Sequence, residues 1–231
     1  MNDLQKAGGV AALIEGIAYI SGFAIFIFFL DSSGYVGPVE KVAFLVQNQT
    51  VLYFGILVIY VLTGVGLVVL AGALHDRTKI ETPALMQIAT AFGLIWAGLL
   101  IASGMIAMVA IETVVGLYAM EPDRAGSVWL AIATVHDGLG GGIELVGGLW
   151  VLLISWAALR SAGLPKTLTY LGLLIGITGI LTVLPALNSL VDVFGLAQIL
   201  WFAWLGIFML RGTRRNSALI PGWPESGTGV V

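Results

Sequence analysis

The residues best suited to chemistry in this chain lie within one short segment. Residues 136–144, HDGLGGGIE, place His136, Asp137 and Glu144 among four glycines in an otherwise apolar stretch. A charged side chain near the centre of a bilayer costs about 2.5 to 3.5 kcal/mol, so it usually faces a partner, a cavity or water. Carboxylates attract protons and cations, and a histidine can relay protons near neutral pH. The segment therefore predicts a binding site for protons or cations.

Three further acidic residues, Glu15, Glu112 and Asp192, lie in or beside apolar runs. When the chain is threaded through a membrane as described below, Glu112 and Asp192 fall on the same side as the glycine-rich segment. Glu15 falls near the other face, where it either extends to the surface or lines an inner half-channel. We therefore expect an acidic cavity that opens to the outer face and is lined by Glu112, His136, Asp137, Glu144 and Asp192.

The same residues also allow a purely structural interpretation. Glycines in membrane helices often serve as close-packing surfaces. If the third and fourth helices project beyond the membrane as a hairpin, then Glu112, His136 and Asp137 are ordinary solvated groups at the interface. Glu144 is the hardest to explain in this way, because residues 145–159 after it carry no charge.

Composition indicates a membrane protein. Of the 231 residues, 59% are hydrophobic and 10% are charged, whereas soluble domains have about 25% charged residues. Apolar runs of about 20 residues recur, and each can cross a hydrocarbon core of roughly 30 Å as a helix that satisfies its own backbone. We predict an all-α, polytopic membrane protein. The absence of cysteine excludes disulfides, thiolate metal sites and thiol catalysis.

Six transmembrane helices are expected. The first apolar run is too long for a signal peptide, so it is interpreted as a span. A half-apolar piece over residues 39–46 is expected to lie along the interface before the second span, and Pro185 is expected to kink the fifth. The predicted spans cover residues 8–30, 51–74, 83–118, 125–159, 167–186 and 191–210.

The third and fourth helices are long for a membrane. Residues 125–159 would form a straight helix of about 52 Å, against a core of roughly 30 Å. Two solutions are open: the third and fourth helices project beyond the membrane as a hairpin, or the glycines at 138 and 140–142 interrupt the fourth.

The distribution of basic residues predicts that both termini are cytoplasmic. With the N-terminus inside, only Lys41 and Arg124 lie on the outer side, an asymmetry typical of a bacterial-type inner membrane. Residues 1–215 are expected to form one six-helix domain, followed by a loose cytoplasmic tail over residues 216–231. The basic residues expected on the inner side are Lys6, Arg77, Lys79, Arg160, Lys166, Arg211, Arg214 and Arg215.

Several sequence stretches carry a resemblance to a known family. They are the S-A-G-L-P turn at residues 161–165, the following helix LGLLIGITGIL, the ending W-F-A-W-L-G-I-F-M-L-R-G, and the opening A-G-G-V-A-A-L-I-E-G-I-A-Y. Together they resemble a bacterial family of six-helix membrane proteins known as a domain of unknown function. The resemblance implies six spans and contributes no activity.

Three functions remain open from the sequence. The first is a carrier or binder of a small solute, with proton or cation coupling as an option. The second is a membrane enzyme using the carboxylates and histidine, with or without a metal; the third is a structural or accessory subunit. No residue is assigned as catalytic, no cofactor is identified, and no metal motif such as H-E-x-x-H is present. The expected partners are the lipid bilayer and a small molecule or cation; nothing points to nucleic acid, and the oligomeric state is open.

Overall fold

The computed structural model describes residues 3–29, 34–141, 143–161 and 163–217, and within these ranges every regular element is a helix. This confirms the all-α prediction. Backbone N–H and C=O groups find no water inside a bilayer, so a chain of this composition satisfies them within helices. Of the tail expected over residues 216–231, only residues 216 and 217 are described, and they belong to α8 (Leu190–Ser217).

Five helical stretches are long and apolar enough to cross a membrane. They are α1 (Asp3–Ala24), which continues as the π-helical η1 (Ile25–Phe29), the stretch Pro38–Thr78, α4 (Pro83–Tyr118), the stretch Pro122–Ser161, and residues Leu190–Arg211 of α8. This number and character of apolar helices indicate a multi-pass membrane protein.

A sixth apolar helix, α7 (Lys166–Leu181), is shorter than the span predicted over residues 167–186. A 3-10 turn, η4 (Pro185–Leu187), follows it, and Leu184 is extended with a φ of −81° and a ψ of 120°. The prediction that Pro185 kinks this span is wrong. A proline disfavours helical backbone in the residue before it, so α7 has already ended.

The second span is part of a longer helical stretch. It comprises α2 (Pro38–Ile56), the π-helical η2 (Leu57–Leu62) and α3 (Thr63–Thr78). Residues 39–46, expected to lie along the membrane interface before the second span, form the first turns of α2. Val42 and Phe44 in these turns are buried against other helices. Asn48 has a non-helical φ of −117°, which marks a bend within α2.

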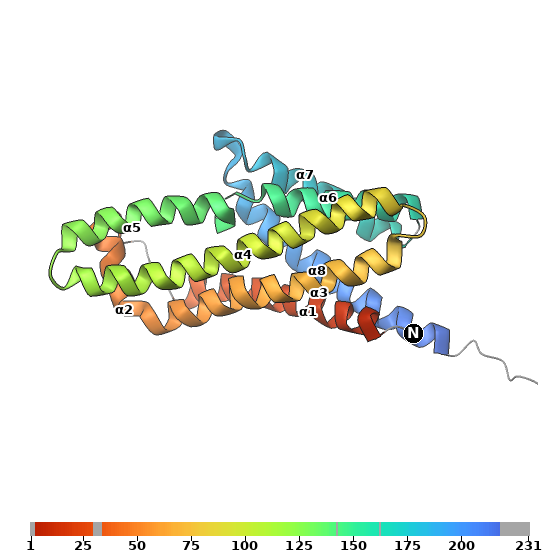
Figure 1. The fold of residues 1–231 in the computed structure, drawn as a ribbon, viewed down its shortest axis with the longest axis horizontal. Helices are drawn as coiled ribbons and strands as arrows, with labels where there is room; N and C mark the ends of the chain where they lie inside the picture. Colours follow the sequence, from red (N-terminus) through yellow and green to blue (C-terminus); the bar gives the residue numbers. More distant parts are fainter. Residues whose placement is uncertain (1–2, 30–33, 142, 162, 218–231) are drawn as a thin grey trace, which may run out of the picture.

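Figure 1 shows that the fold has two parts. In the larger part, α1, α3, α4, α6 (Leu145–Ser161), α7 and α8 pack around a core that includes Trp150, Trp201, Phe194 and Phe202. At the left of the figure, α2, the C-terminal part of α4, and α5 (Pro122–His136) extend beyond the other helices. We term this three-helix part the arm. It has a core of its own, made of Val42, Phe44, Leu45, Ile111, Val114 and Ala125.

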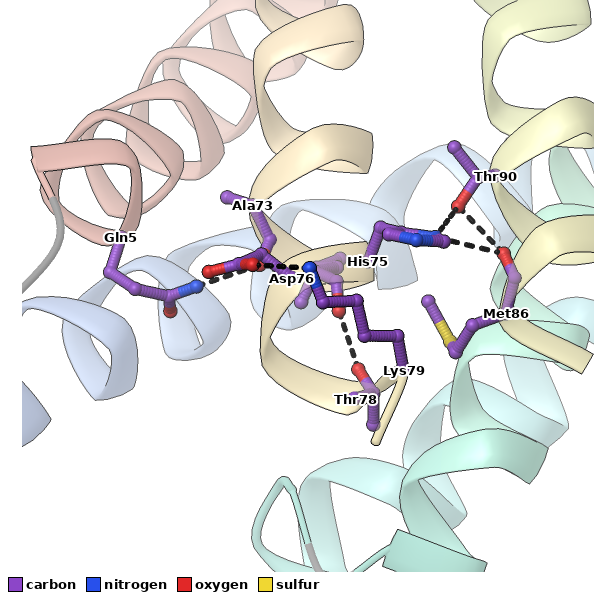
Figure 2. Close-up of polar contacts among 9 residues, drawn as sticks. Gln5, Ala73, His75, Asp76, Thr78, Lys79, Met86 and Thr90 are labelled. Carbon is purple, nitrogen blue, oxygen red and sulfur yellow. Dashed lines mark hydrogen bonds and ion pairs between the residues drawn. The ribbon is translucent and has the colours of Figure 1, made fainter. Parts of the chain in front are cut away.

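The end opposite the arm gathers the N-terminus, the turn between α3 and α4, and the turn between α6 and α7 (Figure 1). Arg77 connects these segments, because its Nε donates to the Gly163 carbonyl (2.9 Å) and its Nη1 to Gln5 Oε1 (3.3 Å). Gln5 Nε2 in turn donates to the Ala73 carbonyl (2.7 Å; Figure 2).

Glycines bring α6 and α7 into backbone contact. A Cβ added to Gly148 would lie 2.7 Å from the Ile180 nitrogen and 2.8 Å from the Gly176 oxygen. A Cβ on Gly176 would lie 2.7 Å from the Leu152 nitrogen. Small residues allow this approach, which supplies van der Waals contact where the hydrophobic effect between helices is weak.

We expect Gly176→Ala to lower the thermal stability of the purified protein in detergent. The added methyl has no room between the two backbones, and overpacking of this kind costs about 1 to 3 kcal/mol. Gly98→Ala is the matched control, because Gly98 lies on exposed α4 surface with nothing within 4 Å of an added Cβ. It should not lower the melting temperature. Equal stability of the two variants would contradict backbone contact between α6 and α7.

Candidate functional site

The glycine-rich segment breaks the fourth predicted span. α5 ends at His136, the π-helical η3 (Asp137–Gly141) follows, and α6 begins at Leu145. Gly140 has a φ of 128°, in the left-handed region that residues with a Cβ rarely adopt. An interruption at the glycines, one of the two solutions expected for an overlong helix, is therefore present. Gly142 lies outside the described residues.

Glu144 is fixed at this break through its backbone. Its N–H donates to Thr182 Oγ1 (2.9 Å), and the Thr182 hydroxyl donates to the Gly179 carbonyl (2.7 Å) near the end of α7. Thr182 is buried. The break is thus attached to α7, while the side chain of Glu144 lines a cavity.

This cavity, which we term the deep cavity, has a volume of about 90 Å³. Glu15 and Glu144 line it with their carboxyl groups, together with two tyrosines and a threonine. Sequence reasoning placed Glu15 at a separate inner site, but the structure brings it together with Glu144. The remaining lining residues are Tyr19, Ile59, Tyr60, Thr63, Trp96, Leu100 and Gly140.

Glu15 is the most buried acidic side chain of the site. It is 2% exposed, and its Oε1 has no hydrogen-bond partner among the described residues. The carboxyl packs against Gly66 of α3, where an added Cβ would lie 2.5 Å from Oε1. The glycine therefore makes room for the carboxyl group between α1 and α3.

A larger cavity of about 520 Å³ lies among α2, α4 and α5, and we term it the arm pocket. Apolar side chains form most of its wall, with a few polar groups from α2 and from the end of α5. Tyr60 of η2 lines both cavities. The arm pocket is lined by Tyr35, Lys41, Phe44, Leu45, Leu52, Ile56, Tyr60, Ala107, Ile111, Trp129, Ile132, Ala133, His136 and Asp137.

His136 and Asp137 belong to the arm pocket and not to the deep cavity. His136 Nδ1 lies 3.4 Å from Asp137 Oδ1. The rings of Tyr60 and His136 make an edge-to-face contact, with their centroids 5.2 Å apart. Ser103 of α4 donates to the His136 carbonyl (3.4 Å). The end of α5 is thereby positioned by contacts to α4 and η2.

Glu112 and Asp192, also expected in the acidic cavity, line neither space. Both are exposed, on α4 and at the start of α8 respectively. On α4 it is Ile111, 1% exposed, that faces the arm pocket. The expected set of five residues is thus divided: Glu144 lies in the deep cavity, His136 and Asp137 in the arm pocket, and the other two on the surface.

Sequence reasoning missed Tyr19, Tyr60 and Thr63, which line the deep cavity. Tyr19 lies in one apolar run, and Tyr60 and Thr63 lie three residues apart in another. A hydroxyl in such a run is also compatible with simple packing. Residue type alone does not distinguish the two roles. Thr63 lines the cavity, yet its hydroxyl also donates to the Ile59 carbonyl one turn earlier, a common local bond for threonine in a helix.

His75, the second histidine, lies in neither cavity and contacts α4 from α3. Its Nδ1 lies 2.8 Å from Thr90 Oγ1 and 3.4 Å from the Met86 carbonyl, so it joins α3 to α4 (Figure 2). Nearby, Lys79 Nζ pairs with Asp76 Oδ1 at 2.8 Å. Within the described ranges, no group of three or more His, Asp or Glu side chains is placed to hold a metal ion.

We expect Gly140→Ala to destabilise the break, because left-handed backbone costs a residue with a Cβ about 1 to 2 kcal/mol. Gly138→Ala is the control: both glycines have nothing within 4 Å of an added Cβ, and only Gly140 has a positive φ. Melting temperatures of the purified variants should separate the two. If both substitutions lower stability equally, the effect does not come from the φ of Gly140.

Comparison with known proteins gives a family and nothing more specific. No curated protein and no solved structure matches the chain. A family model described as "Domain of unknown function (DUF4386)" matches residues 14–212, a range that contains every residue lining the two cavities. The chain is an integral membrane protein of unknown activity, and it belongs to this DUF4386 family.

Proposed function

We propose that this protein binds a small, largely apolar solute in the arm pocket, as a carrier or as a binder. The observation that supports this proposal is the pocket itself, about 520 Å³ in volume. Sites for small molecules are typically clefts of roughly 300 to 1,000 Å³ with apolar and aromatic walls and a few polar groups that orient the ligand.

The chemistry of the wall suggests an amphipathic solute. Phe44, Leu52, Ile111 and Trp129 supply apolar surface for its body. Tyr60, His136 and Asp137 supply hydrogen-bonding groups where α5 ends. Lys41 supplies a further one from the first turns of α2, which lie against Gly126 near the start of α5. A ligand with donor and acceptor groups therefore fits this wall better than a hydrocarbon.

We further propose that residues 1–215 form one domain of six spans, with α7 as the short one, in a bacterial-type inner membrane with both termini cytoplasmic. Basic residues on the end opposite the arm support this orientation through the positive-inside tendency. Arg77, Lys79, Arg160 and Lys166 belong to the two turns at that end or flank them. The arm, and with it the pocket, then faces the outer side.

Cysteine labelling tests this orientation directly, because the chain contains no cysteine of its own. Ser127 on α5 and Glu81 in the turn between α3 and α4 are both exposed. We expect a membrane-impermeant maleimide to modify Ser127→Cys in intact cells, and Glu81→Cys only after permeabilisation. The reverse pattern would invert the orientation, and labelling of both in intact cells would contradict it.

Ligand binding is tested by melting the full-length protein in lipid nanodiscs with a panel of medium-chain fatty acids, aromatic acids and neutral aromatic alcohols. A bound ligand stabilises the folded state by about 2.7 kcal/mol at one hundred times its Kd. We expect at least one panel member to raise the melting temperature of the wild type, and Ala133→Phe, which fills the pocket wall, to abolish the shift.

Ala91→Phe is the matched control, because Ala91 is exposed on α4 and lines neither cavity. It should keep the ligand response of the wild type. Equal shifts in all three proteins would place the panel member in lipid or on another surface, and the absence of any shift would count against the proposal. Uptake of the binding compound into proteoliposomes then separates a carrier from a binder.

A further inference from the structure

We propose that Glu15 and Glu144 form an exchangeable proton site in the deep cavity, and that the proton reaches it past Tyr60 from the arm pocket. The proton comes from water and returns to water, adding to a carboxylate oxygen to give a carboxylic acid, so no other reactant is required. The proposal concerns the deep cavity and holds whichever solute the arm pocket binds.

The Glu15 carboxyl is buried without a counter-charge. Glu15 is 2% exposed and its Oε1 has no hydrogen-bond partner among the described residues. No lysine, arginine or histidine is among the described residues that line the deep cavity. A buried carboxylate needs a partner, and in its absence the group neutralises by taking up a proton.

The groups that surround Glu15 come from every neighbouring element. Tyr19 lies on α1 itself, Tyr60 comes from η2, and Glu144 comes from the break before α6. At Gly16, the residue next to Glu15, the nearest atoms of α8 are the Ile199 oxygen, the Ala203 nitrogen and Phe202 Cβ. Two acidic groups in one small cavity titrate as a coupled pair, because ionisation of one disfavours ionisation of the other.

The deep cavity has room for only a few small molecules. Water occupies roughly 30 Å³ per molecule in the liquid, so a cavity of about 90 Å³ has room for about three. The cavity offers two carboxyls, and within the described residues no group of three or more His, Asp or Glu side chains is placed to hold a metal ion. A proton with a few waters suits this set better than a multivalent ion, whose sites combine several carboxylates with further oxygen ligands.

Tyr60 lines both the deep cavity and the arm pocket, and its ring meets that of His136 with centroids 5.2 Å apart. A proton entering from the arm pocket therefore passes this residue. Tyr60 lies within η2, and π-helical turns are frequent at functional sites because they displace side chains from the regular helical positions.

Infrared spectroscopy of the full-length protein in nanodiscs tests the site. We expect wild-type protein at neutral pH to show the C=O stretch of a protonated carboxylic acid, which shifts in D₂O. Glu15→Gln and Glu144→Gln should each weaken this band. Glu112→Gln is the control, since the same chemical change is made on an exposed glutamate of the same protein.

Tyr60→Phe tests the route separately, because it keeps the ring and removes the hydroxyl. We expect the band to persist in this variant and its exchange in D₂O to slow severalfold, whereas Tyr35→Phe, at the far part of the arm pocket, should exchange like the wild type.

Three results would overturn the proposal: a band that both glutamine variants leave unchanged, the absence of any such band in the wild type across the pH range, or a band that sodium removes at constant pH. The last result would identify a metal cation as the ligand instead of a proton. If Glu15→Gln does not fold, Glu144→Gln gives the same comparison, because Glu144 is anchored through its backbone N–H and not through its carboxyl. A failure of the arm pocket to bind any solute would leave these spectra unaffected, so the two proposals fail independently.

Discussion

The length of three helical stretches relative to a bilayer is the constraint on which the rest of this structure depends. α4 has 36 residues, and at 1.5 Å per residue it measures about 54 Å, against a hydrocarbon core of roughly 30 Å. The stretches Pro38–Thr78 and Pro122–Ser161 are longer still, at 41 and 40 residues. Where these stretches extend beyond the other helices, they pack on one another as the arm, around Val42, Ile111 and Val114. The arm pocket is the space left where this second core meets the first.

Both irregular segments of these long stretches lie beside α4 and contribute to the deep cavity. η2 supplies Ile59 and Tyr60, and η3 supplies Gly140. A π-helical turn holds one more residue than the regular turn, so it shifts the face that the following residues present. α4 itself continues without interruption through the same region. One straight helix with an irregular segment on each neighbour leaves room for a cavity inside a bundle that is otherwise closely packed.

Sequence reasoning reached the elements of this fold and part of its site. The apolar runs predicted the helices, and the glycines between Asp137 and Glu144 indicated where the fourth span would break. The sequence did not specify which face of α4 points inward. Neighbouring residues on a helix point about a hundred degrees apart, and Ile111 faces inward while Glu112 is exposed. Glu15 shows a second gap. Its depth could be estimated from threading the chain through a membrane. Its neighbours across the bundle depend on how α1 packs on α3, where the Glu15 carboxyl lies against Gly66, and the sequence does not specify that packing.

The deep cavity joins two elements that are held in place by different neighbours. Glu15 is carried by α1, which packs along α3 and α8, whereas Glu144 is carried by a broken segment held to α7 through Thr182. If the two carboxyls share a proton, their interaction free energy depends on their separation, and that separation depends on the conformation of the break. Linkage then requires that any change of the break alters proton affinity, and that protonation favours one conformation of the break in return. His136 and Asp137 begin the same segment on its other side, in the wall of the arm pocket. A single glycine-rich segment thus contacts both cavities, which is the arrangement that coupling between a solute and a proton would need.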